Sequence, residues 1–435
     1  MITEEIEIPA SPTTTTTTER VLLITAGIFL FANYLALGTI NLTIIQPVFW
    51  LHFVVWVLCA LAGHWWLNGH LPGRDPLIFA LAMFLAGWGL LLIDRLAPIF
   101  ADRQTIWLIL GTSAMLLVAS FPHALHWLRT YRYTLLLIGL ALLIATIVLG
   151  RNPSGVLGAP QLWLGIGSLF FQPSEALKII LVVFLASYLA EQQPLLRAEE
   201  LSGSHRRLIL PPRIIGPILL MWGISIVMLI WQRDLGTAIL FFVIFLIMLY
   251  TATGSSIILL SGTALILVAA LAGYNLFGVV QLRIDVWINP WLEADGRAYQ
   301  IVQSLMAFAN GGIFGEGIGQ GLPDFIPVVH SDFIFAALGE EWGLLGIIVL
   351  IATISAIVLR GLRIAILHQH HSFRAFLAVG LSMLIAVQSL MIMAGVLKVI
   401  PLTGVTLPFM SYGGSSLLVS FILLGLLLRL SSSEN

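Results

Sequence analysis

The sequence predicts an all-α protein, a polytopic transmembrane helical bundle. Of its 435 residues, 59% are hydrophobic and only 9% are charged, whereas roughly 25% of the residues in a soluble domain are charged. Apolar runs of about 18 to 25 residues recur along the chain, and each is long enough to cross a hydrocarbon core about 30 Å thick. The runs do not alternate apolar and polar residues as transmembrane barrel strands do, so a barrel is excluded.

Each predicted span is an apolar run between polar segments. The runs number about twelve and cover residues 21–41, 48–68, 77–99, 104–121, 132–149, 173–191, 213–231, 235–252, 256–279, 333–359, 374–397 and 412–430. The segment before them, residues 1–19, is polar and contains the threonine run from Thr13 to Thr18. Because this segment carries too little apolar surface to fold, we expect a disordered cytoplasmic tail.

The distribution of basic residues predicts the orientation of the bundle. If the N-terminus is cytoplasmic, most Lys and Arg residues fall in cytoplasmic segments, as the positive-inside rule requires. Both termini are then cytoplasmic, and the long stretch 280–332 is a large extracytoplasmic loop. The remaining basic residues lie outside or at the outer ends of spans, and they are Arg95, Arg103, Arg151, Lys178, Arg233, Arg283, Arg297 and Lys398.

Two polar blocks precede predicted spans on the outer side. In the first, FQPSEALK, Glu175 and Lys178 are three residues apart, so they share a helix face and can pair. Ionisable groups at membrane depth are costly and usually face a polar cavity, so we favour a cavity-lining pair over a cap with Lys178 reaching the interface. In the second, QRDLGTA, Asp234 has an equally good structural explanation as the cap of the next helix.

The outer stretch 280–332 contains the largest set of polar candidates. Its glycine-rich run, Gly311–Gly321, would let backbone N–H groups approach an anion such as pyrophosphate, or would simply form a flexible loop. No βαβ context accompanies the run, so it is not a dinucleotide fingerprint. At the end of the stretch, Asp332 is either a helix N-cap or a general base at the edge of a partly dehydrated cavity, and spacing alone does not decide between them.

The last polar segment, Pro401–Ser416, combines prolines, glycines and hydroxyl side chains. Such a segment makes a poor helix, and irregular backbone at membrane depth is tolerated only where it lines a cavity. All five polar segments fall on the same predicted face. We therefore predict one polar cavity that opens outward.

These five segments resemble the signature blocks of the shape, elongation, division and sporulation (SEDS) family. The matching blocks are FQPSEALK, QRDLGTA, the stretch from Arg283 through YQIVQS, HSDFIFAALGEEWG and PLTGVTLPFMSYGGSS, and the resemblance covers residues 74–430. It implies a ten-helix SEDS-like core at residues 73–431, preceded by an extra pair of transmembrane helices at residues 20–72. Three residues depart from the family pattern: Arg233 replaces a common proline, Ile392 a common asparagine and Lys398 a common glycine.

The resemblance also implies an activity: a peptidoglycan glycosyltransferase that polymerises lipid II in the bacterial cytoplasmic membrane during elongation or division. It implies that Asp332 is the catalytic residue. Our hypothesis is that Asp332 takes the hydroxyl proton while Arg283 and loop N–H groups stabilise the departing undecaprenyl pyrophosphate. Its substrate-binding residues would be Gln172, Glu175, Lys178, Asp234, Arg283, Gln303, Ser304, His330, Ser411, Tyr412, Gly413 and Gly414.

The expected partners are lipid II, membrane lipids and a class B penicillin-binding protein that supplies transpeptidation, with no nucleic acid. A divalent cation, Mg or Mn, would suit a pyrophosphate leaving group, but no ligand spacing identifies a metal site. The only cysteine, Cys59, excludes an intrachain disulfide. Two other functions fit a polar cavity in a helical bundle: a flippase or transporter of a lipid-linked precursor, and a non-catalytic scaffold of the division or elongation machinery.

Overall fold

The structure is a computed structural model, and it confirms a polytopic, nearly all-α membrane protein. It describes residues 12–40, 42, 44, 46–152, 161–166, 169–201, 223, 226–227, 230–232 and 234–432. Within these residues, eleven helices are long and apolar enough to cross a membrane. They lie in α1 (Pro12–Ile40), α2 (Leu51–His70), α3 (Ile78–Leu96), α4 (Pro98–Ser120), α6 (Arg132–Leu149), α7 (Pro173–Leu201), α9 (Leu235–Thr253), α10 (Ser256–Leu276), α13 (Ile334–Leu367), α14 (Ser372–Val396) and α15 (Gly414–Ser431).

Shorter elements connect these helices. The two strands pair antiparallel, with Leu164 opposite Phe171. The expected span 213–231 and the departure at Arg233 lie largely outside the described residues. The connecting elements are η1 (Pro47–Trp50), α5 (Ala124–Thr130), β1 (Leu164–Ile166), β2 (Leu169–Phe171), α11 (Gly278–Ile288), η2 (Pro290–Glu293), α12 (Tyr299–Gly311) and η3 (Pro323–Phe325).

The centre of the bundle is formed by α3, α7, α14 and α15, which are mostly buried by their neighbours. Helix α15 packs along α4, and α14 lies between α13 and α7. Small residues allow these close approaches: a Cβ on Gly111 would lie 2.8 Å from the Phe421 ring, and one on Gly425 would lie 2.7 Å from the Met115 carbonyl oxygen. Close backbone packing is the main source of helix association in lipid, where apolar burial gives no advantage.

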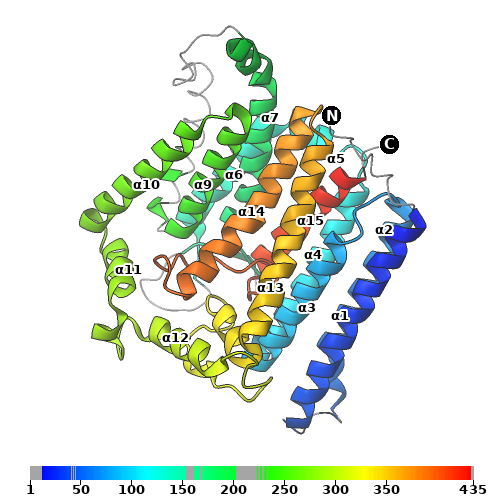
Figure 1. Cartoon of the computed structure of the whole chain (residues 1–435), viewed down its shortest axis with the longest axis vertical. Helices are drawn as coiled ribbons and strands as arrows, with labels where there is room; N and C mark the ends of the chain where they lie inside the picture. Colours follow the sequence, from blue (N-terminus) through cyan, green and yellow to red (C-terminus); the bar gives the residue numbers. More distant parts are fainter. Residues whose placement is uncertain are drawn as a thin grey trace, which may run out of the picture.

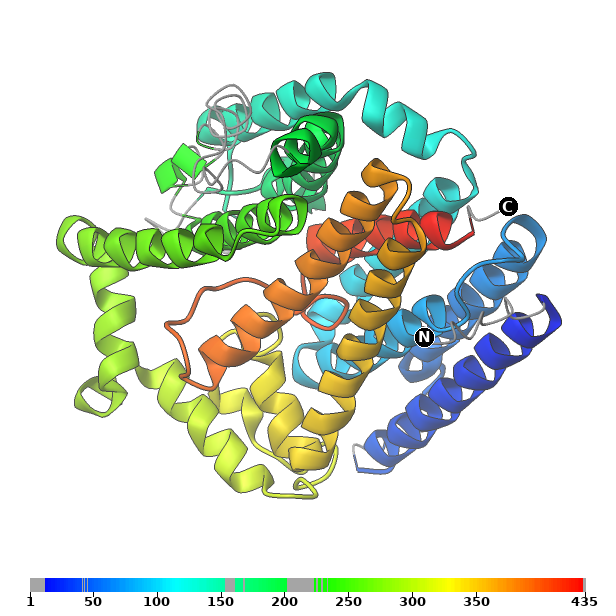
Figure 2. The same cartoon turned by 45° about the horizontal axis from the view of Figure 1, so that its top comes forward.

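The N-terminal helix pair α1 and α2 packs against α3 and α4 on one side of the bundle (Figures 1 and 2). Trp56 of α2 donates its indole N–H to the Met83 carbonyl of α3 (2.8 Å), and its ring lies against Gly87. This pair is therefore joined to the core by specific contacts as well as by apolar packing.

The prediction of a disordered tail is wrong for residues 12–19, because α1 already begins at Pro12. Proline suits the first turn of a helix, where its missing N–H has no partner to lose. Glu19, at the end of the expected tail, is fully buried and accepts two hydrogen bonds from Arg74 (2.6 and 2.9 Å) and lies 2.6 Å from His64. The polar composition of the threonine run gave no sign of this long-range ion pair.

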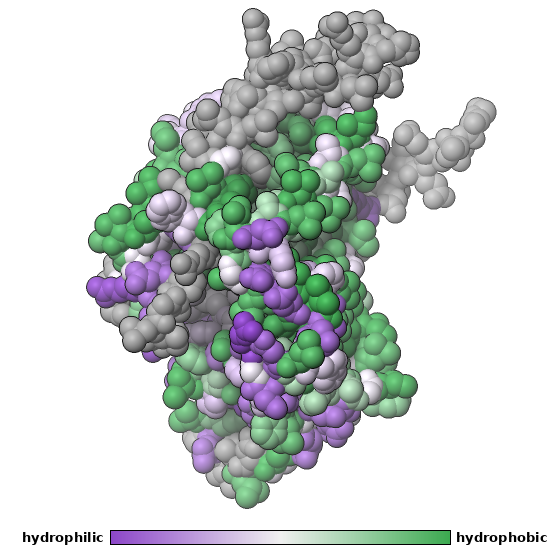
Figure 3. Space-filling model, turned by 90° about the vertical axis from the view of Figure 1, so that its left-hand side faces the viewer, coloured by the Kyte–Doolittle hydropathy of each residue, from purple (hydrophilic) through white to green (hydrophobic). Residues whose placement is uncertain are grey.

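The stretch 280–332, expected as a loop, is substantially helical. Helix α11 covers residues 278–288 and α12 covers residues 299–311. Figures 1 and 2 show α10, α11 and α12 as an arm that leaves the bundle at α9 and returns to it at α13. The face that carries this arm is apolar above and gathers hydrophilic residues in its middle and lower parts (Figure 3). The arm therefore places a polar surface beside the helical core.

Candidate active site

A cavity of about 240 Å³ lies between the arm and the core. Its walls come from α11, the start of α12, the turn before α13, and the segment that follows α14. The cavity brings together the two ends of the predicted outer stretch, Arg283 and Asp332. It is lined by Leu282, Arg283, Val286, Trp287, Arg297, Gln300, Ile301, Asp332, Gly395, Lys398, Ile400, Leu402 and Gly404.

Among the residues that the structure describes, Asp332 is the only carboxylate that lines this cavity, and its side chain is partly buried. The N-cap of α13 is Phe333, and no side chain caps this helix. The N-cap explanation of Asp332 is therefore wrong, and the carboxylate is left facing the cavity with a hydrogen bond from the Ser331 hydroxyl (2.8 Å). Burial raises the pKa of Asp332, and the Ser331 hydrogen bond and the positive charge of Arg283 only partly oppose that shift.

Arg283 reaches the cavity from α11 and donates a hydrogen bond to the Thr403 carbonyl (3.2 Å). Burial lowers the pKa of its guanidinium, and the charges of Asp332 and Asp234 oppose this. A guanidinium in protein stays protonated despite such a shift. Arg283 therefore places a permanent positive charge near the catalytic candidate.

Arg297 and Lys398 complete a set of three cations in the lining, against the one carboxylate of Asp332. Neither was predicted to bind substrate. The sequence did contain a signal for them, since both belong to the few basic residues that the positive-inside rule leaves on the outer side. Three cations around one carboxylate make a cavity that favours a multiply charged anion.

The segment after Pro401 fixes the turn that carries Asp332. Ser411 donates its hydroxyl to the Ser331 carbonyl (2.6 Å) and accepts from the Leu407 N–H (2.9 Å). The Tyr412 N–H donates to the His330 carbonyl (2.9 Å). These bonds give the predicted residues Ser411, Tyr412 and His330 a positioning role directly beside the cavity.

The rings of His330 and Tyr412 lie 5.5 Å apart and both contact Phe100 of α4, each with a centroid separation of 4.7 Å. Burial lowers the pKa of His330, which favours the neutral imidazole. Neither ring belongs to the cavity lining. The cluster thus attaches the turn that carries Asp332 to α4 through apolar contact.

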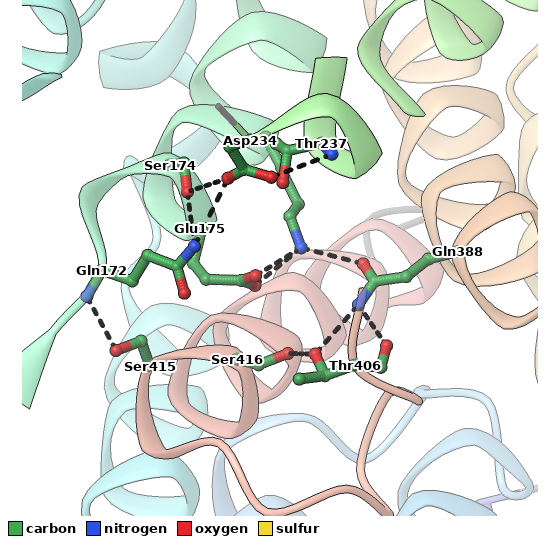
Figure 4. Close-up of polar contacts among 10 residues, drawn as sticks. Gln172, Ser174, Glu175, Asp234, Thr237, Gln388, Thr406, Ser415 and Ser416 are labelled. Carbon is green, nitrogen blue, oxygen red and sulfur yellow. Dashed lines mark hydrogen bonds and ion pairs between the residues drawn. The ribbon is translucent and has the colours of Figure 1, made fainter. Parts of the chain in front are cut away.

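Glu175 and Lys178 do pair, as predicted, but inside the core rather than at the large cavity. The Lys178 ammonium donates to both Glu175 oxygens (2.7 Å each) and to Gln388 of α14 (3.0 Å). Figure 4 shows the side chains of Glu175 and Gln388, the two partners of this ammonium, directed into the same space between the helices. The pair borders a small void of about 20 Å³, close to the volume of one water molecule.

The network around this pair extends to the last polar segment. Gln388 donates to the Thr406 carbonyl (2.7 Å), and the hydroxyls of Thr406 and Ser416 lie 2.7 Å apart (Figure 4). Five residues after Thr406, Ser411 donates its hydroxyl to the Ser331 carbonyl. A buried polar network that is this fully connected rigidifies its surroundings. We infer that the pair supports the turn that carries Asp332 from a distance.

Asp234 is the N-cap of α9 and accepts from the Thr237 N–H (3.2 Å). It also accepts from Ser174 (3.3 Å) and Gln172 (3.4 Å), so it joins the starts of α7 and α9. The capping prediction for Asp234 is confirmed. The structure does not bring Gln172 or Asp234 into the cavity lining.

Four other predicted binding residues have packing explanations or lie outside the cavity. Ser304 is fully buried and donates to the carbonyls of Ile301 (2.8 Å) and Val396 (3.3 Å), and Gln303 is absent from the lining. A Cβ on Gly414 would lie 2.0 Å from the Trp107 indole nitrogen, so only glycine fits there. The Gly413 N–H faces the Gln104 side chain of α4 (3.4 Å).

The glycine-rich run does not supply N–H groups to the cavity. The Gly319 N–H donates to the Glu341 carboxylate (3.2 Å), and the Leu322 N–H to the Glu340 carboxylate (3.3 Å). A Cβ on Gly311 would lie 2.0 Å from the Gly339 carbonyl oxygen, which shows how tightly the run packs on α13. Other N–H groups of the run donate to backbone carbonyls, as those of Glu316 and Gly317 do to Glu340 and Glu341, and no residue of the run lines the cavity. The structure therefore gives no support to the prediction that this run binds a pyrophosphate in this cavity.

The lining offers no protein cage for a divalent cation. Its single carboxylate lies among three cations, and the described part of the chain contains no cluster of three His, Cys, Asp or Glu side chains suited to a metal ion. Hard cations bind several oxygen ligands. The donor set therefore does not fit a resident metal, and no catalytic step is assigned to one.

Fold and site together define a class: a polytopic membrane protein with a carboxylate in a cationic cavity that opens beside its helical core. The family described as cell cycle protein, which comprises FtsW, RodA and SpoVE, matches residues 79–435. The peptidoglycan glycosyltransferase RodA of Mycobacterium tuberculosis is 37% identical over 382 residues, which is 85% of this chain and 80% of that protein. The probable peptidoglycan glycosyltransferase FtsW of Geobacter metallireducens is 31% identical over 82% of this chain and 94% of that protein.

Solved structures share the fold. RodA of Thermus thermophilus gives a TM-score of 0.58 at 23% identity and covers 82% of this chain and 96% of its own. A chain from a peptidoglycan synthase complex, solved for the coordination of polymerization and crosslinking, gives a TM-score of 0.67 at 24% identity over 83% of this chain and 99% of its own. This chain belongs to the SEDS family, the RodA- and FtsW-like peptidoglycan glycosyltransferases.

Proposed function

We propose that this chain polymerises lipid II into glycan strands and that Asp332 is the general base. The hydroxyl of one lipid II attacks the anomeric carbon of the growing strand and forms the new glycosidic bond. The bond from that carbon to the pyrophosphate oxygen breaks, and the hydroxyl proton passes to Asp332. The observation that carries this proposal is a half-buried carboxylate in a cavity lined by three cations.

The electrostatics of the cavity suit both halves of this reaction. A carboxylate whose pKa is raised by desolvation is a stronger base than an ordinary aspartate. The pyrophosphate gains charge as it departs. Arg283 and its neighbouring cations are preorganised to stabilise that charge, which is usually the largest single contribution to such catalysis.

We propose that the cavity lies on the outer face of the cytoplasmic membrane and that both termini are cytoplasmic. Helix α14 begins beside the basic segment that holds Arg360, Arg363 and Arg374 and ends next to the cavity. Its 25 residues are long enough to separate the two faces. The positive-inside rule assigns the basic end to the cytoplasm.

The proposed partner is a class B penicillin-binding protein, which would crosslink the strands that this chain makes. The support is the likeness to a chain from a complex that coordinates polymerization and crosslinking. The lining has one carboxylate and so offers few ligands to a divalent cation. We therefore propose that any divalent cation enters as the counterion of the substrate pyrophosphate. Chelation with EDTA should then lower the rate without lowering the melting temperature of the protein.

The decisive experiment compares polymerisation with lipid movement. The purified chain, with its partner, is incubated with labelled lipid II, and glycan products are separated by length. The same protein in liposomes is assayed for lipid II scrambling. Glycan strands are expected. Scrambling without strands would favour the flippase, and neither activity would favour the scaffold.

A further inference from the structure

Lys398 occupies an unusual backbone position at the end of α14. The helix ends with a Schellman motif: the Val399 N–H donates to the Ala394 carbonyl (2.8 Å), and the Lys398 N–H to the Gly395 carbonyl (3.1 Å). The first residue after the helix in this motif must adopt the left-handed backbone conformation, and Lys398 does so with a φ of 60°. Glycine is the usual residue there because a Cβ is strained in that region.

The surrounding structure holds Lys398 in this conformation. The indole N–H of Trp287 on α11 donates to the Lys398 carbonyl (3.1 Å), so the strained residue is tied to the opposite wall of the cavity. Strained residues persist where their surroundings over-determine them, and they concentrate at binding and catalytic sites. Gly395 and Lys398 both line the cavity, so the motif itself forms part of its wall.

The charge of Lys398 differs from those of the other two lining cations. Arg297 forms a bidentate ion pair with Glu293, and Arg283 interacts with both Asp332 and Asp234. Among the described residues, no carboxylate forms an ion pair with the Lys398 ammonium. Unlike the Arg283 guanidinium, which donates to the Thr403 carbonyl, the Lys398 ammonium has neither a hydrogen-bond partner nor an ion-pair partner among the described residues, so its charge is free to bind an incoming anion.

We propose that the Lys398 ammonium binds the pyrophosphate of the lipid-linked substrate in this cavity and sets the affinity for it. This inference rests on the proposed function. A lysine at this position costs stability relative to glycine, and a compact, freely rotating ammonium is suited to a tetrahedral phosphate group. Arg283, whose guanidinium already donates to the Thr403 carbonyl, would then act chiefly on the charge that develops as the pyrophosphate departs.

The test measures kcat and KM for lipid II, inhibition by undecaprenyl pyrophosphate, and the melting temperature of the full chain with its partner. Lys398→Gly removes the charge and the strain together, and Lys398→Arg keeps the charge. The matched control is Leu42→Gly, because Leu42 is also left-handed (φ 56°) and lies exposed at the end of α1, outside the cavity lining.

We expect Lys398→Gly to raise KM and the inhibition constant of undecaprenyl pyrophosphate by about tenfold, which corresponds to one charged hydrogen bond. Its melting temperature should not fall. Lys398→Arg should recover most of the affinity, and Leu42→Gly should leave KM unchanged.

Three results would overturn the inference. An unchanged KM in Lys398→Gly would show that the ammonium does not bind substrate. A raised KM with unchanged inhibition by undecaprenyl pyrophosphate would show that it binds another anionic group of lipid II. A fall in the melting temperature that accounts for the lost activity would show a structural role. Failure of the unmodified protein to polymerise lipid II would instead refute the proposed function.

Discussion

Removing Glu175 should destabilise the protein by leaving the Lys178 ammonium buried without a counterion. The two side chains are 9% and 4% exposed, and the ammonium donates two of its three hydrogen bonds to Glu175. Breaking such a buried pair by removing one partner costs about 3–5 kcal/mol. For a chain of 435 residues, the average unfolding entropy per residue converts this to a fall of about 3–5 °C in melting temperature.

The assay is thermal melting in detergent followed by tryptophan fluorescence, alongside the rate of lipid II polymerisation. Glu175→Met should melt at the lower temperature, whereas Glu175→Met combined with Lys178→Met should recover most of the stability, because no charge stays buried. If the pair only supports the fold, the double variant should also keep its activity. A charge swap of the two residues that restores the activity lost in the single variants would show that pairing itself matters.

Two results would refute this reasoning. A Glu175→Met protein as stable as the unmodified protein would show that the Lys178 ammonium does not need Glu175 as its counterion. A stable double variant without activity would refute a purely structural role, because it would show that activity needs the two side chains themselves or the Lys178–Gln388 bond of the network that reaches Thr406 and Ser411.

Three further predictions follow from the same contacts. The kcat/KM for lipid II should fall as the pH is lowered through the raised pKa of Asp332, so an acid limb centred at or below pH about 3.9, the value of an ordinary aspartate, would contradict the role of desolvation. Gly311→Ala should lower the melting temperature because its Cβ meets the Gly339 carbonyl oxygen at 2.0 Å, whereas Gly278→Ala, with no atom within 4 Å, should melt like the unmodified protein. Glu19→Gln should destabilise the protein by about 3 kcal/mol, because it removes the negative charge that pairs with buried Arg74. Limited proteolysis should then cut α1 faster than in the unmodified protein. Equal cleavage rates would argue against a role of this ion pair in holding α1.

The sequence predicts the fold and the ends of the cavity because both depend on local patterns. Apolar runs of membrane-spanning length identify helices without knowledge of their neighbours. Arg283 and Asp332 are polar residues outside such runs, and the orientation of the spans puts them on the same face. Their convergence on one cavity is therefore within reach of topology alone.

The errors and omissions arise from contacts between distant segments. Glu19 belongs to a polar segment, and only its pairing with Arg74, 55 residues later, explains why it is buried in a helix. Nothing near the glycine run indicates that Glu340 and Glu341 accept hydrogen bonds from the N–H groups of Glu316, Gly317 and Gly319. Lys398 is similar, because the turn that points it into the cavity depends on Trp287 of another helix.

Asp332 also illustrates how geometry decides between two local explanations. A residue just before a helix is often its cap, and the sequence alone left that possibility open. The structure gives the N-cap position to Phe333 and leaves the Asp332 carboxylate at the cavity wall. The assignment of a catalytic role thus rests on the absence of a capping bond within the described residues together with the cationic surroundings.

The most direct test of this account is the initial rate of lipid II polymerisation by Asp332→Asn beside that of the unmodified protein. Loss of a general base should lower the rate by about 10²–10⁴-fold. Because the folded-state pKa of Asp332 is raised, ionisation at this site costs stability as the pH rises through that pKa, and the neutral amide should be at least as stable at neutral pH. A well-folded Asp332→Asn protein that polymerised lipid II at the normal rate would contradict the central claim.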